Sequence, residues 1–259
     1  MSLETAVSSS SRTLTTMPDL AYTDPRIAAI YDILNPAAED TAFYLRLAGQ
    51  TPQRVLDMGC GTGHLAVALA EQGHSVVSAD PARAMLDVAR RKPNAGQVTW
   101  VEADAAGLDL DTRFDLITTT GHVFQVFLTD EAVHEALVNL KRHLAVNGRL
   151  TFETRNPAFR AWEKWTPDQA TGQAAIPEIG LITIYYDVQT VTDKLVTFNT
   201  SIHFASEEVV VVASTLRFMY QAELVKHLQQ AGFTQMQWFG NWDGSQLQSD
   251  SPEIIVIAS

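Results

Sequence analysis

The chain has 259 residues, of which 46% are hydrophobic and 19% charged, and its formal net charge is −12. No apolar run approaches the ~20 residues that a membrane-spanning helix needs. The acidic balance argues against a nucleic-acid substrate, because nucleic-acid affinity comes largely from Lys and Arg on phosphates. These properties favour a protein of one large domain, or one domain with an insertion, that binds a small molecule and has no membrane or nucleic-acid partner.

The first 20 residues are rich in Ser and Thr. They lack the apolar core of a signal peptide and the several arginines of a transit peptide, so we predict a disordered tail at residues 1–20, followed by a single domain at 21–259. Cys60 is the only cysteine, which excludes an internal disulfide framework and makes a cytoplasmic location the default. No base stands beside it in the sequence, so a small filler side chain is favoured over a reactive thiol.

Two helices are predicted at the start of the domain. Asp24 followed by Pro25 is a typical helix start, and apolar residues at spacings of three and four continue to Leu34. A second helix covers residues 39–48 and ends at Gly49.

From residue 54 to residue 154, strands and helices alternate. Strands are predicted at 55–57, 75–80, 98–102, 114–118 and 149–154, and helices at 65–71, 82–91 and 130–144. Such repetition builds a parallel sheet with helices on both faces and right-handed crossovers.

The pattern then changes. Residues 156–180 contain three prolines and two glycines and predict a long loop or lid with little regular structure. Strands at 181–188, 195–204 and 209–219 predict an antiparallel insertion, and the insertion or lid as a whole covers residues 156–219. A helix at 221–231 and two strands, at 233–239 and 253–258, complete the chain.

The strand at 55–57 leads through glycines 59, 61 and 63 into a helix. Such a turn brings bare backbone and a helix N-terminus up to a ligand. A dinucleotide site would need a third glycine at position 64, which is His64, so a NAD-dependent dehydrogenase is disfavoured. The spacing G-x-G-x-G is instead the one found in S-adenosylmethionine-binding sheets, and we predict cofactor contacts from Gly59, Cys60, Gly61 and Gly63.

Three aspartates stand at or just beyond the ends of successive predicted strands: Asp57, Asp80 and Asp104. Parallel strands present their carboxyl ends at one edge of the sheet, where open α/β folds bind ligands. Asp57 can serve the ammonium of an amino-acid end, and Asp80 can accept hydrogen bonds from both ribose hydroxyls. Asp104 can accept from the amino group of adenine, with the Ala105 N–H available to a ring nitrogen.

The segments V-L-D-M-G-C-G-T-G, V-V-S-A-D-P, V-E-A-D-A and F-D-L-I-T-T-T resemble, in order over residues 54–155, the motifs of class I S-adenosylmethionine-dependent methyltransferases of the small-molecule type. The resemblance implies an α/β, Rossmann-like, doubly wound sheet of seven strands, mostly parallel, with the last strand antiparallel. It also implies cofactor contacts at Thr119, Thr120 and Pro81, and places Tyr22 and Tyr31 over the sulfonium end of the cofactor.

Methyl transfer from a sulfonium needs an aligned acceptor, and a base only where the acceptor must lose a proton. His122 and Arg155 are the candidate catalytic residues, His122 as a base and Arg155 as a partner for an acidic substrate. Each has an equally plain structural role, as a loop hydrogen bond for the histidine and a structural ion pair for the arginine. The insertion and the aromatic residues Trp162, Trp165 and Trp242 are expected to roof the acceptor pocket.

The sequence therefore predicts a methyltransferase that uses S-adenosyl-L-methionine and acts on an oxygen or nitrogen atom of a small molecule, with no metal. Two alternatives stay open: transfer of a different group from a sulfonium nucleoside, and a catalytically silent cofactor-binding protein. The identity of the acceptor, and the choice between monomer and homodimer, are not predicted.

Overall fold

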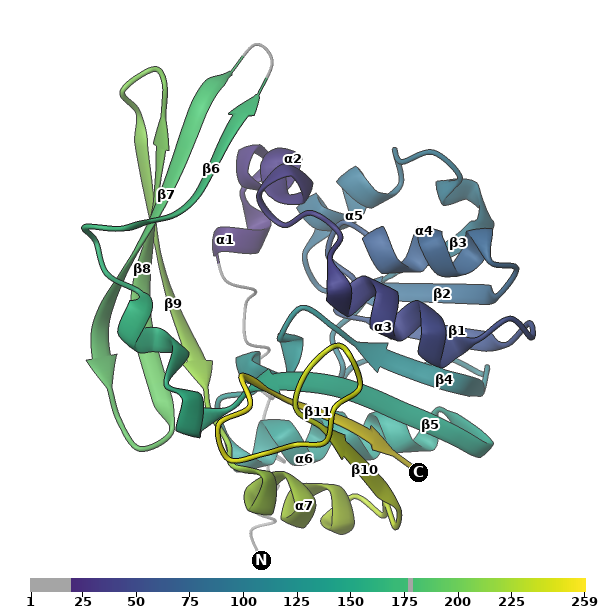
Figure 1. Ribbon diagram of the computed structural model, residues 1–259. Coiled ribbons are helices and arrows are strands. Elements are labelled where there is room, and N and C mark those ends of the chain that lie inside the picture. The colour runs from purple at the N-terminus through teal and green to yellow at the C-terminus, as the bar shows by residue number, and fades with distance from the viewer. Residues whose placement is uncertain (1–19, 177–178) are drawn as a thin grey trace, which may run out of the picture.

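The computed structural model describes residues 20–176 and 179–259, so all but the last residue of the predicted tail lies outside the described part of the chain. The centre of the fold is a seven-stranded sheet in the order β10-β11-β5-β4-β1-β2-β3 (Figure 1). The strands are β1 Arg54–Met58, β2 Ser75–Asp80, β3 Val98–Glu102, β4 Phe114–Thr119, β5 Leu144–Arg155, β10 Met236–Phe239 and β11 Glu253–Ala258. Strand β11 is antiparallel to both of its neighbours and the other pairs are parallel, which confirms the predicted Rossmann-like sheet.

Helices cover both faces of this sheet, because its central strands are apolar on both sides (Figure 1). One face carries α3 (Glu39–Ala48), α4 (His64–Glu71) and α5 (Arg83–Ala89), and the other carries α6 (Asp130–Arg142) and α7 (Gln221–Gln230). Val55 and Leu116 belong to the core cluster with α3 and α4, whereas Leu56 and Ile117 belong to the cluster with α6 and α7. The alternation along each strand thus feeds two separate cores.

The boundary between α6 and β5 differs from the prediction. The helix predicted at 130–144 ends at Arg142, and the strand predicted at 149–154 already begins at Leu144. Leu144 pairs with Phe114 across a register shift in the sheet. Between Leu144 and Arg149 the pairing with β4 is interrupted, and Asn147 takes a left-handed φ of 64° in this irregular stretch of the strand.

The insertion forms a second, antiparallel sheet of four strands, not three. Its strands are β6 Ala170–Ile176, β7 Gly180–Val191, β8 Leu195–Phe204 and β9 Val209–Arg217. The prediction of an irregular segment was wrong for β6, whose A-T-G-Q-A-A-I sequence has weak strand propensity. Pairing with β7 holds it extended. The rest of that segment contains two short 3₁₀ helices, η3 (Pro157–Phe159) and η4 (Ala161–Lys164).

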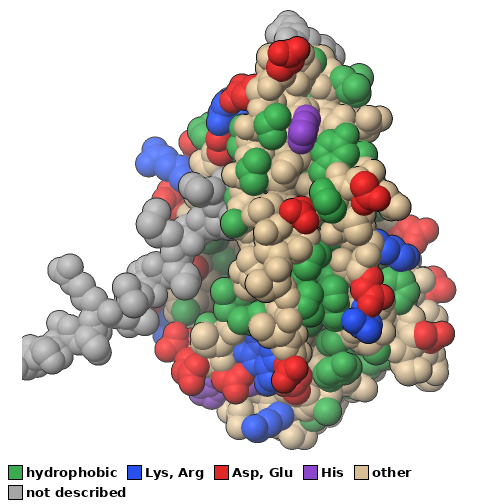
Figure 2. Space-filling view, turned by 90° about the vertical axis from the view of Figure 1, so that its left-hand side faces the viewer, with side chains coloured by type: hydrophobic (Ala, Val, Ile, Leu, Met, Phe, Trp, Pro, Cys, Tyr) green, Lys and Arg blue, Asp and Glu red, His purple; other side chains and the backbone are tan. Residues whose placement is uncertain are grey.

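The two faces of the insertion sheet have different environments. One face packs through Ile182 and Ile202 against Ile27 and Ile30 of α2 (Pro25–Leu34), which stands between the two sheets (Figure 1). The opposite face is open, and hydrophobic side chains gather on it (Figure 2). The exposed apolar residues on that face include Leu181, Val209 and Val211.

The predicted start of the N-terminal helix is confirmed. The Arg26 backbone N–H donates to Asp24 Oδ1 at 2.9 Å, and Pro25 occupies the first turn. A short helix, α1 (Leu20–Thr23), precedes it. No helix in the described ranges is long and apolar enough to cross a membrane. The description of residues 21–259 as one domain with a lid at 156–219 stays a prediction.

We expect replacement of Gly63 by alanine to destabilise the fold. Gly63 has a φ of +75°, and an added Cβ would lie 2.3 and 2.6 Å from two carbons of the Trp100 ring. The strained backbone and the overlap together should lower the free energy of unfolding by about 2–4 kcal/mol, measured by urea denaturation.

Gly73→Ala is the matched control. Gly73 has a φ of +90° with nothing within 4 Å of an added Cβ, so its substitution introduces the backbone strain without the overlap. It should lower the free energy of unfolding by only about 1 kcal/mol. Equal losses in the two variants would contradict the packing role of the Gly63–Trp100 contact.

Candidate active site

The site lies at the edge of the central sheet where β1, β2 and β4 end, which faces the insertion sheet (Figure 1). In β1, Asp57 stands beside Ser78 of β2 and Thr118 of β4. Asp80 is the last residue of β2, and Asp104 follows the end of β3 by two residues. The strand order therefore brings the three predicted aspartates to one edge.

Asp57 is the most deeply buried of the three aspartates. Its side chain is 1% exposed. One carboxylate oxygen accepts the Thr118 hydroxyl at 2.9 Å, and the other has no hydrogen-bond partner among the described residues. Burial, with a smaller contribution from the neighbouring Asp80 and Glu153, raises the pKa of Asp57 to about 7. A buried acid in this state is suited to a ligand that brings a cation.

The glycine turn leaves space beside this carboxylate. Gly61 has a φ of +52°, and nothing lies within 4 Å of a Cβ built on it, so its backbone is open to a ligand. Cys60 is half-buried, and burial raises the pKa of its thiol well above the usual range. The sulfur is therefore a neutral thiol, in agreement with a filler role.

Asp80 organises the turn from the next strand. Its two carboxylate oxygens accept the N–H groups of Gly61 and Ala82, both at 2.8 Å. Each oxygen keeps a lone pair for a further donor, such as a hydroxyl group. Burial raises the pKa of Asp80 in spite of these two hydrogen bonds. Pro81, which follows it, is exposed at the same edge.

Asp104 and Ala105 lie on a loop that α6 holds in place. Asp104 Oδ1 accepts the Gly107 N–H at 2.6 Å, and Ala105 is buried. Asn139 donates from its side-chain nitrogen to the carbonyl oxygens of Ala105 and Leu108, both at 2.8 Å. Sequence reasoning missed Asn139, although a polar residue on the buried face of a helix is a signal for such a contact.

The residues at the end of β4 are also in place. Thr119 is buried, and its hydroxyl has no partner among the described residues, while Thr120 is half-buried. The orphan hydroxyl of Thr119 and the orphan oxygen of Asp57 lie at the ends of adjacent strands. Buried polar atoms without partners are rare in proteins, so their presence at one edge fits a bound polar ligand.

Helix α2 approaches this edge from above. Tyr31 is half-buried with its ring 6.5 Å from that of Tyr22, edge to face. Burial raises the pKa of Tyr31, and the nearby Tyr22, Tyr186 and Asp80 raise it further. These neighbours place Tyr31 between the aspartates and the insertion sheet.

A polar contact that sequence reasoning missed ties α2 to the glycine turn. Asp32 of α2 accepts the Thr62 hydroxyl and pairs with the Lys92 ammonium at 2.5 Å. Asp32 and Thr62 are 30 positions apart in the chain, and Lys92 lies 30 positions beyond Thr62. No local sequence pattern therefore reveals the contact.

The two candidate catalytic residues both have structural partners. His122 follows β4, and its Nε2 lies 3.0 Å from Glu253 Oε2. Arg155, the last residue of β5, donates to Gln125 Oε1 at 2.9 Å, and its guanidinium lies 5.4 Å from the centroid of the Trp165 ring. The arginine therefore stands between the sheet edge and the aromatic residues of the insertion.

The structure settles which insertion residues face this edge. Tyr186 lies on the inner face with Trp165, at 5.7 Å between ring centroids. Tyr185 and His203 contact each other on the opposite face. Trp242 is not part of the roof of the insertion, because it packs against Phe43 and Tyr44 beside α3.

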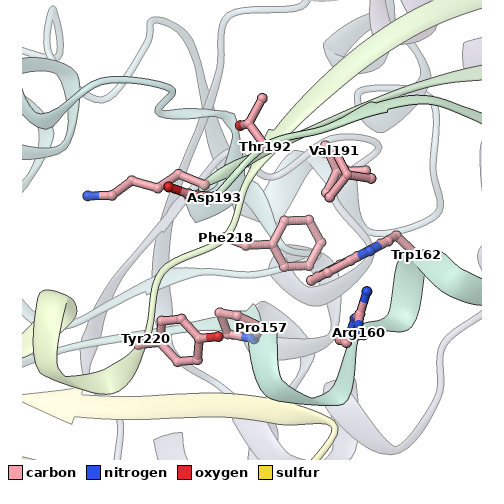
Figure 3. Close-up of a pocket in the computed structure, with 10 residues that line it drawn as sticks. Pro157, Arg160, Trp162, Val191, Thr192, Asp193, Phe218 and Tyr220 are labelled. Carbon is pink, nitrogen blue, oxygen red and sulfur yellow. The ribbon is translucent and has the colours of Figure 1, made fainter.

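A groove of about 440 Å³ lies between the segment of η3 and η4 and the turn that joins β7 to β8 (Figure 3). Its lining residues are Pro157, Arg160, Trp162, Val191, Thr192, Asp193, Lys194, Val196, Phe218 and Tyr220. Trp162 and Phe218 form its apolar floor, with their ring centroids 4.6 Å apart. None of the three strand-end aspartates lines it, so it is separate from the sheet edge that carries them.

The edge fits the group that its motifs imply. The orphan oxygen of Asp57 suits an ammonium, the open backbone at Gly61 leaves room for it, and Asp80 retains lone pairs for hydroxyl donors. An α/β protein with such a sheet edge belongs to the class of proteins that bind a nucleoside bearing an amino-acid end.

Comparisons with known proteins point the same way. Residues 55–148 match the family model described as "Methyltransferase domain". The chain is 32% identical over 146 residues to the cypemycin N-terminal methyltransferase of Streptomyces sp, covering 55% of this chain and 60% of that protein. It is 43% identical over 106 residues to the demethylmenaquinone methyltransferase of Thermus thermophilus, covering 39% and 46%.

Solved structures share the whole fold at low sequence identity. An S-adenosylmethionine-dependent methyltransferase from Clostridium acetobutylicum superimposes with a TM-score of 0.75 at 17% identity, covering 90% of this chain and 97% of that one. The sugar N-methyltransferase KedS8 from Streptoalloteichus sp gives 0.70 at 16% identity, covering 98% of each chain.

Residues 55–148 of this chain match a methyltransferase domain, and the whole fold is that of S-adenosylmethionine-dependent methyltransferases of known structure. The chain spans about 60% of the cypemycin relative and 46% of the Thermus relative, so what the whole protein does is a matter for proposal.

Ligand binding should release a proton from Asp57. An ammonium beside the carboxylate favours its ionised form, so affinity for S-adenosylmethionine should rise as the pH increases towards the pKa of about 7 and level off above it. Calorimetry in buffers of different ionisation enthalpy should detect proton release at about pH 6 and little at about pH 8. Asp57→Asn should bind more weakly and release no proton.

The same group affects the stability of the ligand-free protein. Because its pKa is raised from 3.8 to about 7, the folded state binds more protons than the unfolded chain between these values, and stability falls as the pH rises through this window. The Asp57→Asn variant should show a smaller fall. If stability depends on pH identically in the two proteins, the raised pKa of the buried Asp57 carboxyl is contradicted.

Proposed function

We propose that this protein transfers a methyl group from S-adenosylmethionine to an oxygen or nitrogen atom of a small molecule. The observation that carries the proposal is the buried Asp57 carboxylate with one unpartnered oxygen, beside the open backbone of Gly61. The chemistry of the edge supports it as well: the strand-end positions of Asp80 and Asp104 suit the ribose and the adenine of the same ligand.

The residues of the edge have distinct roles in holding this cofactor. Asp57 and the glycine turn take the amino-acid end, Asp80 takes the ribose hydroxyls, and the loop of Asp104 and Ala105 takes the adenine. When bound, the cofactor supplies an electrophilic methyl group on a sulfonium. The chain must then orient the acceptor and exclude water, and orientation alone can contribute ~7–11 kcal/mol to lowering the barrier.

The acceptor side is proposed to lie between the sheet edge and the inner face of the insertion. Four side chains lie close together there: Tyr31, Arg155, Trp165 and Tyr186. Tyr186 raises the pKa of Tyr31, Arg155 lowers the pKa of Tyr186, and the Arg155 guanidinium lies over the Trp165 ring. Aromatic faces and one cation suit an organic acceptor with a flat or apolar body. Similar proteins are named as a cypemycin N-terminal methyltransferase and a sugar N-methyltransferase, so amines are the first acceptors to test.

Calorimetric titration tests the cofactor assignment. S-adenosylmethionine and S-adenosylhomocysteine should bind, and NAD should not. Asp80→Asn should weaken binding about tenfold or more, because it removes charge-assisted hydrogen bonds to the ribose. Asn is preferred to Ala because it keeps one oxygen as an acceptor for the turn.

Asp109→Asn is the matched control, since Asp109 is exposed and pairs with Arg142 instead of facing the cofactor edge. Unchanged affinity in Asp80→Asn would contradict the cofactor assignment.

Incubation with labelled cofactor and a metabolite extract tests turnover, and labelled product should form. Tight cofactor binding without labelled product from a wide pool of amines and hydroxyl compounds would favour a silent binding protein.

Helix α2 is proposed to roof the cofactor. It is tied to the glycine turn through Asp32 and to the insertion through Arg26, which pairs with Glu208 at 2.6 Å. Asp32→Ala should speed cofactor dissociation about three- to tenfold, measured by stopped-flow displacement. Arg26→Gln should change the rate less, because that ion pair is solvent-exposed. Equal dissociation rates in wild type and Asp32→Ala would contradict the roof.

A further inference from the structure

The position of His122 is fixed by its backbone. After β4, the chain passes through Gly121 at a φ of 72° and His122 at a φ of 60°. A non-glycine residue seldom adopts this left-handed conformation, and where it does, surrounding contacts hold it there. Here the His122 backbone N–H donates to Glu153 Oε1 at 2.7 Å.

Glu153 is itself a buried anchor. Its side chain is 1% exposed, and its second oxygen accepts the Tyr44 hydroxyl. Burial raises its pKa, while the nearby His122 and the two hydrogen bonds lower it. The residue after His122 also fixes the segment, because the Val123 side chain comes so close to Gly59 that an added Cβ would lie 2.7 Å from it. His122 is therefore held beside the glycine turn.

The ring of His122 is held by a second carboxylate. Its Nε2 lies 3.0 Å from Glu253 Oε2, with the histidine side chain 21% exposed and the glutamate 14% exposed. An ionised carboxylate only accepts hydrogen bonds, so Nε2 must carry the proton. Nδ1 then has a free lone pair, and it has no hydrogen-bond partner among the described residues.

We infer that Glu253 is a positioning residue that holds His122 as its Nε2–H tautomer, so that Nδ1 accepts the proton of the methyl acceptor. The inference rests on the proposed methyl transfer and adds to it the need for a base. The acceptor's oxygen or nitrogen lone pair forms the new bond to the methyl carbon, and the carbon–sulfur bond breaks with its electron pair going to sulfur. The acceptor proton moves to Nδ1, and solvent later removes it.

The groups around the imidazole suit this role. Glu253 would stabilise the imidazolium that forms, as a carboxylate does in other histidine bases. The other charged or titratable groups facing this segment are Glu153 and Tyr44 on its backbone side, and Arg155, the residue opposite Glu253 in the β5–β11 pair. Arg155 is directed to Gln125 and Trp165, so it does not compete for Glu253.

Nitrogen-15 NMR of the imidazole tests the tautomer without any methyl transfer. At alkaline pH, where the ring is neutral, the His122 signal should show a protonated Nε2 and a bare Nδ1; the His122→Asn variant assigns the signal. In Glu253→Gln the amide can accept from or donate to Nε2, so the signal should move towards a mixture of tautomers. A protonated Nδ1 in the wild-type protein would overturn the inference.

A double-mutant cycle adds the functional readout. With an acceptor from the labelling screen, Glu253→Gln should lower kcat about tenfold or more with little change in KM. The double variant with His122→Asn should be no slower than His122→Asn alone, because Glu253 acts through the histidine. Asp109→Asn should keep wild-type kcat.

Additive losses in the cycle would overturn the positioning role. Cofactor affinity, measured by calorimetry in the same variants, separates this inference from the proposed function. If Glu253→Gln and His122→Asn bind S-adenosylmethionine normally and turn over at the wild-type rate, the base is refuted and methyl transfer stands. If the wild-type protein binds no cofactor, the proposed function fails, while the tautomer measurement still decides the role of Glu253.

Discussion

The burial of the Asp57 carboxylate is the constraint around which the site is built. The sheet removes this acid from water, Thr118 satisfies one of its oxygens, and Asp80 and Glu153 add negative charge nearby. Desolvation and like charges both oppose ionisation, so the ligand-free site holds an electrostatic cost. A ligand that carries a cation relieves this cost. The carboxylates that destabilise the ligand-free protein therefore favour binding of such a ligand.

The segments that surround the carboxylate are positioned by contacts between distant parts of the chain. Asp80 shapes the glycine turn from the next strand, Asn139 holds the loop of Asp104 and Ala105 from α6, and Asp32 joins α2 to Thr62. Each contact satisfies a polar group that would otherwise be unpaired at a crowded edge. The geometry of this sheet edge therefore depends on the packing of both helical layers, and not on the glycine turn alone.

The sequence was informative where the signal is local. The glycine turn, the strand-end aspartates and the Asp24–Pro25 helix start depend on residues close together in the chain, and the central strands are continuous apolar runs. Strand β6 was missed because its extended form comes from pairing with β7 and not from its own residues. The facing of Tyr185 and Tyr186 could not be predicted, since the register of a strand is set by its partners. The His122–Glu253 pair joins residues 131 positions apart, which no local pattern indicates.

This difference between the two sides of the site has a physical consequence for specificity. The proposed donor side is formed by short motifs of the central sheet, whereas the proposed acceptor side is formed by a separate sheet that meets it through α2, Arg155 and Trp165. Changes on the inner face of the insertion, at Tyr186 for example, can reshape the proposed acceptor space without disturbing the environment of Asp57, because the cluster in which Tyr186 packs contains no residue of β1. A fold divided in this way can keep one methyl donor while its acceptor varies.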